Sequence, residues 1–316
     1  MKILILGAGA MGSLFAGKLT KCGFDVTLYN RPNNHVEIMK QQGMQMVHDK
    51  GDFATLHVPV YTNPADLPGD YELMLVLIKS FATKAVLEKV LPMVDDKTPI
   101  LTLQNGIGNL ELIQQLAPTH EVFVGGTSAG AGWVKQGVIE QRAWGKTFIG
   151  STKPTNENVD FLKKVAATFS ESGLETLVSD NVQSIIWSKL VVNIAYNGLT
   201  AVTRLKNGEA IEYKEGKELV SKLVEEAVEV AHAKEISLLY KDPVQECIRL
   251  GIEEIGRNIS SMLTDVLHQR KTEIEVINGA IVKEGKRLQI ATPYNNMMYK
   301  LVKMIDQSYP RTILHP

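Results

Sequence analysis

Three glycines within the first twelve residues constrain the fold of this chain more than any other feature. They stand in Gly7-Ala8-Gly9-Ala10-Met11-Gly12, directly after the apolar run Ile3–Leu6 and at the start of a helical pattern. In such a strand–loop–helix unit, the first glycine permits a tight turn and the second lets the backbone approach a pyrophosphate. The third lets the helix pack closely on the strand. The motif predicts a dinucleotide-binding loop; a tight turn without a ligand is the alternative.

The first part of the chain alternates β-rich runs with helical patterns, which is typical of a parallel sheet with helices on both faces. The predicted strands are Lys2–Leu6, Asp25–Tyr29, Leu56–Val60, Leu73–Leu77, Ile100–Leu103, Val122–Thr127 and Glu175–Val178, with a hairpin of Gly137–Arg142 and Lys146–Gly150 around Trp144-Gly145. The predicted helices are Ala10–Lys21, Ala82–Leu91, Leu110–Leu116 and Asn158–Ser172. We therefore expect an α/β Rossmann-type domain over residues 1–179.

The pattern changes after residue 179, where helical periodicity dominates and no convincing strand remains. The predicted helices are Val182–Tyr196, Lys217–Ala233, Pro243–Arg257, Met262–Val282 and Tyr294–Asp306. We therefore expect an all-α domain over residues 180–316.

The end of the second predicted strand indicates which dinucleotide the loop takes. An NAD-specific site usually places Asp or Glu there to bind the ribose hydroxyls. This chain has Asn30 and Arg31 instead, and a guanidinium can pair with the 2′-phosphate of NADP. The sequence thus favours NADP(H), with an exposed loop arginine as the alternative interpretation of Arg31.

The segment from Val182 to Asn197 is apolar almost all round, except for one narrow polar stripe. Lys189, Asn193 and Asn197 follow one another at i, i+4 and i+8 and therefore share one helix face. A lysine beside a ligand is a credible proton donor or carboxylate partner. The stripe predicts a helix that lines a polar cleft, although a narrow solvent-exposed stripe explains the spacing equally well.

Composition excludes several classes of function. The formal net charge of -1 gives no field for nucleic acid or an anionic membrane. No window approaches the ~20 apolar residues that a membrane span needs. The two cysteines are far apart, and the histidines show no ligand spacing, so we expect reduced thiols, no metal and a cytoplasmic protein.

In order and spacing, these motifs resemble the ketopantoate reductase (2-dehydropantoate 2-reductase) family over essentially the whole chain. Besides the glycine loop and the polar stripe, the resemblance rests on Leu77-Ile78-Lys79, Leu103-Gln104-Asn105-Gly106, Trp187-Ser188-Lys189, Asn207-Gly208, Ser260-Ser261-Met262, Asp265, Arg270-Lys271-Thr272-Glu273-Ile274-Glu275 and Asn278-Gly279. The resemblance implies NADPH-dependent reduction of 2-dehydropantoate to (R)-pantoate, on the way to pantothenate and coenzyme A. It also implies that the N-terminal domain binds NADP(H) and that the all-α domain carries the substrate and the catalytic group. It leaves open a monomer or a homodimer.

The resemblance also implies a role for each matching residue. Lys189 is similar to the family's proton donor. Residues that resemble its substrate contacts are Asn105, Asn193, Asn197, Asn207 and Ser261. Residues that resemble its cofactor contacts are Gly7, Ala8, Gly9, Ala10, Met11, Gly12, Arg31, Lys79, Asn105, Ala129 and Glu273.

Several of these residues also have an ordinary structural interpretation. Asn105 and Asn207, each before a glycine, fit simple turns, and Ser261 fits a helix N-cap. Glu273 fits a surface acid. On one straight helix Ser261 and Glu273 would point about 120° apart, so they face different regions or the helix breaks between them. Asp265 is expected to have a structural role.

Two other functions remain open. One is a D-2-hydroxyacid dehydrogenase of the same family that acts on other branched or aromatic 2-oxo acids, with NADH as its possible cofactor. The segment Gly130-Ala131-Gly132-Trp133 departs from the family pattern and bears on substrate choice. The other is a redox-sensing protein that binds the dinucleotide without turnover.

Overall fold

The computed structural model describes residues 1–47 and 53–311, which group into two compact units. The first unit contains Met1–Gln104 and Asn109–Val182, and the second contains Asn105–Gly108 and the chain from Gln183 onward. A single boundary near residue 179 does not provide for the short loop 105–108, which leaves the sheet and groups with the helices. The division into a cofactor domain and a substrate domain stays a prediction.

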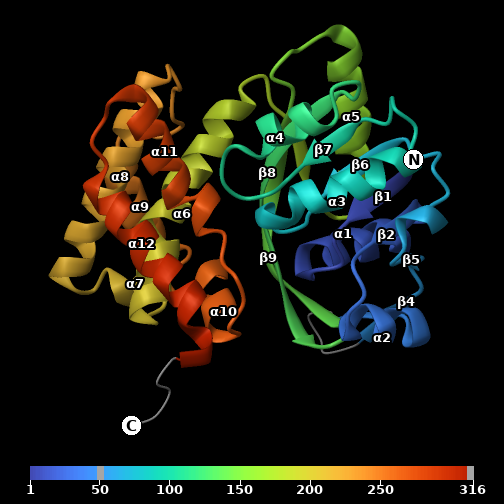
Figure 1. The fold of residues 1–316 in the computed structure, drawn as a ribbon, viewed down its shortest axis with the longest axis horizontal. Coiled ribbons are helices and arrows are strands. Elements are labelled where there is room, and N and C mark those ends of the chain that lie inside the picture. The colour runs from blue at the N-terminus through green and yellow to red at the C-terminus, as the bar shows by residue number, and fades with distance from the viewer. Residues whose placement is uncertain (48–52, 312–316) are drawn as a thin grey trace. The chain divides into compact units, whose positions relative to one another are not determined.

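The first unit contains a mostly parallel sheet, with blue to green strands in Figure 1. Its strands are β1 (Lys2–Leu6), β2 (Asp25–Tyr29), β3 (Met44–Val47), β4 (Phe53–Leu56), β5 (Val60–Tyr61), β6 (Leu73–Val76), β7 (Ile100–Thr102), β8 (Val122–Lys135), β9 (Val138–Gly150) and β10 (Thr176–Val178). Their order is β4-β3-β9-β8-β7-β6-β1-β2-β5, with β10 beside β9. Only the β8–β9 and β3–β4 pairs are antiparallel among the described strands.

Helices bury both faces of this sheet. They are α1 (Ala10–Lys21), α2 (Asn34–Gln42), α3 (Thr83–Val90), α4 (Asn109–Leu116) and α5 (Asn156–Glu171). Ile3 and Ile5 of β1 join one core cluster with Phe15 of α1 and Phe169 of α5, whose rings meet edge to face. Side chains alternate along a strand, so the equally buried Leu4 and Leu6 point to the other face. Burial on both faces explains why these strands are continuous apolar runs, and it confirms the expected α/β Rossmann-type fold.

The expected hairpin around Trp144-Gly145 is wrong. Strand β9 runs unbroken from Val138 to Gly150, and the turn that joins it to β8 contains Gly137, whose φ is +77°. Gly145 instead lies where the β8–β9 register shifts, and a Cβ there would be 2.4 Å from the Cβ of Ser128. Gly145 therefore belongs to a β-bulge and not to a turn, and its lack of a side chain lets the two backbones approach closely.

The region around residue 56 also differs from the prediction of one strand, Leu56–Val60. The structure has two strands, β4 and β5, with Pro59 just before the second. Proline has no N–H to contribute to a ladder, so it interrupts the run. Helix α2 and strand β3 were not predicted at all.

The second unit contains only helices among its described residues (mostly yellow to red in Figure 1). They are α6 (Val182–Thr203), α7 (Asn207–Ala210), α8 (Lys214–Ala233), α9 (Pro243–Glu253), α10 (Ser261–Leu267), α11 (Asn278–Leu288) and α12 (Pro293–Ser308), with a 3-10 turn η4 (Ile274–Val276). This confirms the all-α character expected of the C-terminal part.

Helix α6 forms the centre of the second unit's core. Trp187, Leu190, Val191 and Ile194 are buried there with apolar side chains of the surrounding helices. By length and composition alone, α6 is the one described helix that could cross a membrane, which corrects the expectation that no such window exists. Its apolar window is 67% buried inside the protein, as expected for a core helix.

The predicted helix Met262–Val282 breaks into α10, η4 and α11. Gln269 adopts a left-handed conformation with φ +52°, and the N–H of Arg270 returns to the carbonyl of Asp265 at 2.8 Å. This 6→1 bond is the Schellman arrangement that ends a helix. The buried Asp265 carboxylate also pairs with the Arg270 guanidinium at 3.1 Å, which agrees with its expected structural role.

Candidate active site

The glycine loop of the first unit lies where the sheet changes direction of winding. The chain leaves β1 for β2 on one side and later returns to β6 on the other, and both pairs are parallel. In open α/β sheets, ligands bind outside the carboxyl ends of the strands at such a switch point. The loop after β1, Arg31 after β2 and Lys79 after β6 all follow carboxyl ends at this edge.

The geometry of the glycine loop fits a pyrophosphate. Gly7 has φ +109°, a conformation open to glycine, and a Cβ on Gly12 would be 1.7 Å from the Gly7 carbonyl oxygen. A Cβ on Gly9 would meet no atom within 4 Å. Two glycines are therefore required by the fold, whereas the third leaves open space beside the N-terminus of α1. That helix begins without a side-chain cap or an acid in its first turn, so its N–H groups suit an anion.

An amide, not a carboxylate, follows strand β2. The Asn30 Oδ1 accepts the Ala8 N–H at 3.1 Å, and its Nδ2 donates to the Arg31 carbonyl at 2.7 Å. Asn30 thus ties the end of β2 to the glycine loop, and Arg31 extends beyond it as an exposed side chain. The position that usually carries an acid for the ribose is neutral here, with a cation next to it.

Gln104 supports the loop around Lys79, a role that the sequence did not reveal. Its Nε2 donates to the Ile78 carbonyl at 2.8 Å and to the Thr83 Oγ1 at 2.9 Å. These bonds hold the turn that presents the half-buried Lys79. A glutamine among apolar strand residues was the available signal.

Ala129 lies in β8 at the bulge opposite Trp144. Its backbone N–H donates to the Thr127 Oγ1 at 3.1 Å, and Thr127 in turn accepts from the Thr147 hydroxyl at 2.8 Å. The Ala129 N–H is thus already bonded within β8. Four residues further along β8, the Trp133 ring stacks on the buried His35 ring, with the two ring centroids 4.4 Å apart. The Trp133 ring therefore packs within the first unit.

In the second unit, the structure brings together Lys189 and Asn105, which are 84 residues apart in sequence. The half-buried Lys189 on α6 donates from Nζ to the Asn105 Oδ1 at 2.9 Å. The loop of Asn105 is held against η4, because the Ile107 N–H donates to the Val276 carbonyl at 3.1 Å. Gly106 permits this approach, since a Cβ there would be 2.2 Å from the Val276 carbonyl oxygen. The Asn105-Gly106 pair is therefore more than a surface turn.

The Lys189 ammonium has an unusual acidity. Desolvation by burial lowers its pKa from 10.5 to about 8, and the charge of Glu273 opposes part of that shift. Glu273 is itself buried, just before η4, and is therefore not a surface acid. A lysine with a pKa near neutrality can both hold and release a proton at physiological pH. Such perturbed groups are common at catalytic sites.

The other two residues of the α6 stripe differ in burial. Asn193 is half-buried, whereas Asn197 is only 5% exposed and its Nδ2 has no hydrogen-bond partner in the described structure. A buried N–H donor without a partner is unfavourable. The stripe is thus not an ordinary solvent-exposed face, and Asn197 offers a donor that a ligand or water can satisfy.

Asn207 opens α7 and is held by the turn after α9. Its Nδ2 donates to the Ile255 carbonyl at 3.2 Å, and the next N–H, of Gly208, donates to the Gly256 carbonyl at 2.9 Å. The Oδ1 of Asn207 is buried and has no partner among the described residues. Asn207 therefore combines the expected turn with an acceptor that remains available.

Ser260, not Ser261, is the N-cap of α10. Its Oγ accepts the Leu263 N–H at 3.0 Å, while the Ser261 side chain is exposed as the first residue of the helix. The capping interpretation of Ser261 is therefore wrong. Because α10 ends at Leu267, Ser261 and Glu273 do not lie on one helix, which is the second of the two expected alternatives.

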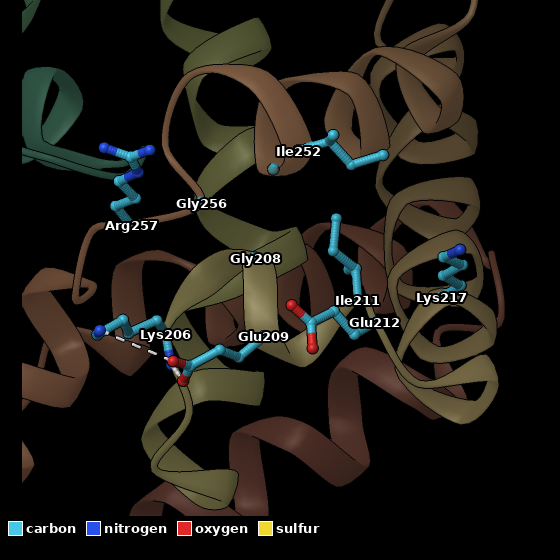
Figure 2. Close-up of a pocket in the computed structure, with 10 residues that line it drawn as sticks. Lys206, Gly208, Glu209, Ile211, Glu212, Lys217, Ile252, Gly256 and Arg257 are labelled. Carbon is cyan, nitrogen blue, oxygen red and sulfur yellow. Dashed lines mark hydrogen bonds and ion pairs between the residues drawn. The ribbon is translucent and has the colours of Figure 1, made fainter.

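A cavity of about 470 Å³ in the second unit lies beside the turn that holds Asn207 (Figure 2). Lys206 and Glu209, joined by dashed lines in the picture, line it together with Gly208, Gly251 and Arg257. None of the site residues predicted from the sequence is among its lining residues. Within residues 1–47 and 53–311, no cluster of three or more His, Cys, Asp or Glu is arranged to hold a metal ion.

Family models match both the N-terminal and the C-terminal part of the chain. The family model "Ketopantoate reductase PanE/ApbA" matches residues 3–154, and "Ketopantoate reductase PanE/ApbA C terminal" matches residues 181–306. The chain belongs to the ketopantoate reductase family. It is therefore an oxidoreductase with a Rossmann-type first unit. A 2-dehydropantoate 2-reductase of Pyrococcus horikoshii is 34% identical over 304 residues, which cover 96% of this chain and 97% of the relative.

Two solved structures share the fold over almost the full chain. A ketopantoate reductase from Ralstonia eutropha has a TM-score of 0.88 at 29% identity and covers 98% of this chain and 99% of its own. A D-mandelate dehydrogenase with NADH and anilino(oxo)acetate has a TM-score of 0.91 at the same identity and the same coverage. The same fold therefore occurs in a ketopantoate reductase and in a D-mandelate dehydrogenase.

The glycine loop gives a test that separates folding from ligand binding. We expect Gly9→Ala to leave the melting temperature unchanged, because its Cβ enters open space, but to raise the Kd for NADPH and NADH by about tenfold or more. Gly12→Ala is the matched control, and it should lower the melting temperature because of the clash with Gly7. Unchanged dinucleotide binding in Gly9→Ala, measured by calorimetry, would show that the loop does not hold the pyrophosphate.

Proposed function

We propose that the protein catalyses the NADPH-dependent reduction of 2-dehydropantoate to (R)-pantoate, a step of pantothenate and coenzyme A biosynthesis. The observation that carries the proposal is the Lys189–Asn105 pair, with an ammonium whose pKa is lowered to about 8. Membership of the ketopantoate reductase family supports this reaction. The first unit would hold the dinucleotide and the second would hold the 2-oxo acid and the proton donor.

In the first unit, the residues that would contact the dinucleotide are Gly7–Gly12, Arg31, Lys79 and the Ala129 region. In the second unit, they are Glu273 and Asn105. When bound, the reduced nicotinamide supplies a hydride. As the C2 carbonyl carbon of the substrate gains this hydride, negative charge grows on its oxygen. The Lys189 ammonium stabilises that charge and donates its proton, which gives the alcohol and a neutral amine that solvent reprotonates.

The remaining polar residues would orient the 2-oxo acid. The Asn197 Nδ2 is a buried donor without a partner in the described structure, and Asn193 lies one turn before it on the same face. The exposed Ser261 hydroxyl can bind the substrate carboxylate, and Asn207 offers an amide near the start of α10. Holding the carbonyl in a reactive orientation lowers the entropic part of the barrier.

A second candidate is a D-2-hydroxyacid dehydrogenase that acts on branched or aromatic 2-oxo acids with NADH. The similarity to D-mandelate dehydrogenase, solved with NADH, favours it specifically. The residues that perform proton transfer would be the same, so only substrate and cofactor selection differ. In either case we propose a cytoplasmic enzyme, monomeric or homodimeric, that binds neither nucleic acid nor membrane.

The deciding experiment is a steady-state assay of NADPH oxidation with 2-dehydropantoate, 2-oxoisocaproate and phenylglyoxylate. We expect the highest kcat/KM for 2-dehydropantoate. A preference of about a hundredfold for either of the other acids, roughly 3 kcal/mol of transition-state discrimination, would establish the second candidate instead. Binding of NADPH without turnover of any 2-oxo acid would identify a dinucleotide sensor.

The acidity of Lys189 predicts opposite pH profiles for the two directions of the reaction. Reduction needs the ammonium, so its kcat/KM should be level below pH 8 and fall above it, whereas oxidation needs the neutral amine and should rise toward pH 8. Glu273→Gln removes a charge that raises the Lys189 pKa, so both profiles should shift to lower pH.

Lys189→Ala should lower kcat by orders of magnitude, because the proton donor is lost, while the NADPH affinity stays nearly unchanged. Turnover by Lys189→Ala with the pH profile of the wild type would exclude Lys189 as the donor.

Arg31 predicts the choice between the two dinucleotides. We expect Arg31→Ala to weaken NADPH by about tenfold or more, because a guanidinium–phosphate pair is lost, while NADH binding changes little. The neighbouring exposed Asn34→Ala is the matched control, and Kd values for both dinucleotides provide the measurement. An equal loss for NADPH and NADH would contradict a contact with the 2′-phosphate.

A further inference from the structure

The polar stripe of α6 continues beyond Asn197 to Thr200. Thr200 is eleven residues after Lys189, or about three helical turns at 3.6 residues per turn, and therefore lies on the same face as Asn193 and Asn197. Unlike them, Thr200 is fully buried and its hydroxyl contacts another helix: its Oγ1 lies 2.8 Å from the Ser260 Oγ. The stripe thus ends on the N-cap of α10.

The donors and acceptors of this contact form one directed chain. The Leu263 N–H donates to the Ser260 Oγ, and the Thr200 hydroxyl donates to the Tyr196 carbonyl at 2.8 Å. Each hydroxyl carries a single proton. With the Thr200 proton used on Tyr196, the Ser260 hydroxyl donates to the Thr200 Oγ1. Both hydroxyls are satisfied, and the first turn of α10 is connected through them to the backbone of α6.

The residue that follows Ser260 is Ser261, whose side chain is exposed. Because the N-cap is bonded both to Leu263 within α10 and to Thr200 on α6, the backbone from which the Ser261 side chain extends is held in place relative to the stripe. Thr203, one turn beyond Thr200 on α6, has the same bond back to its own helix, from its hydroxyl to the Leu199 carbonyl at 2.8 Å, but it is exposed. The link to α10 therefore belongs to Thr200 specifically.

We propose that Thr200 and Ser260 are positioning residues for the substrate carboxylate. They hold the Ser261 hydroxyl at a fixed distance from Lys189, Asn193 and Asn197, and so set the length of 2-oxo acid that can contact both ends of the stripe. The inference rests on the proposed substrate role of Ser261. Neither Thr200 nor Ser260 touches the substrate itself.

The test uses Thr200→Val, which keeps the shape of the side chain and removes the hydroxyl. We expect the KM for the preferred 2-oxo acid to rise by about tenfold, the scale of one misplaced hydrogen bond, while the KM for NADPH stays unchanged. Thr200→Ser restores the hydroxyl and should restore the KM. Thr203→Val, the matched control, should leave both constants as in the wild type.

A double-mutant cycle with Ser261→Ala distinguishes positioning from a general structural effect. If Thr200 acts through Ser261, then Thr200→Val should add little to the KM of a protein that already carries Ser261→Ala. An equal rise in both backgrounds, or no rise in the single variant, would overturn the positioning role. If Ser261→Ala alone leaves the KM unchanged, the substrate role of Ser261 fails instead.

A second variant keeps the test decisive if Thr200→Val does not fold. Ser260→Gly retains most of the N-cap preference but lacks the hydroxyl that reaches Thr200. It should raise the KM for the 2-oxo acid in the wild-type background and add little with Ser261→Ala. A Ser260→Gly protein with the KM of the wild type would overturn the proposal.

Discussion

The apolar side chains of helix α6 must be buried, and the second unit is organised around that requirement. Trp187, Leu190, Val191 and Ile194 lie in a core that other helices complete. Each large apolar side chain removed from water contributes roughly 1.5–3 kcal/mol. A helix this apolar has no stable place on the surface, and the same hydropathy makes it resemble a membrane span by composition.

The burial that stabilises α6 also determines the chemistry of its polar stripe. Lys189 shares the helix with these apolar residues, so its ammonium is partly removed from water and its pKa falls to about 8. Glu273 keeps the shift moderate, and the Asn105 Oδ1 accepts one of the N–H groups at 2.9 Å. Core formation and the proposed proton transfer thus depend on the same helix, and a substitution that loosens α6 would affect both the core and the acidity of Lys189.

The sequence predicted well where structure is local. Strands β1 and β2 and helix α1 agree residue for residue with the expected ranges, because an apolar run, a glycine turn and a 3.6-residue period are read within a few residues. It failed where distant contacts decide. Gly145 lies in a bulge between β8 and β9 and not in a turn. Gln269 ends α10 in a left-handed conformation, which is more typical of glycine and is therefore not predicted from a glutamine.

By itself, the sequence determined the glycine loop, the missing acid after β2 and the stripe Lys189, Asn193 and Asn197, because each depends on spacing along one element. Only the tertiary structure decided that Asn105 leaves the sheet to meet Lys189, that Glu273 is buried beside it, and that Thr200 bonds to Ser260. The partners in these contacts are about 60 residues apart or more. No local pattern encodes such pairs; they follow from packing α6, η4 and α10 around one core.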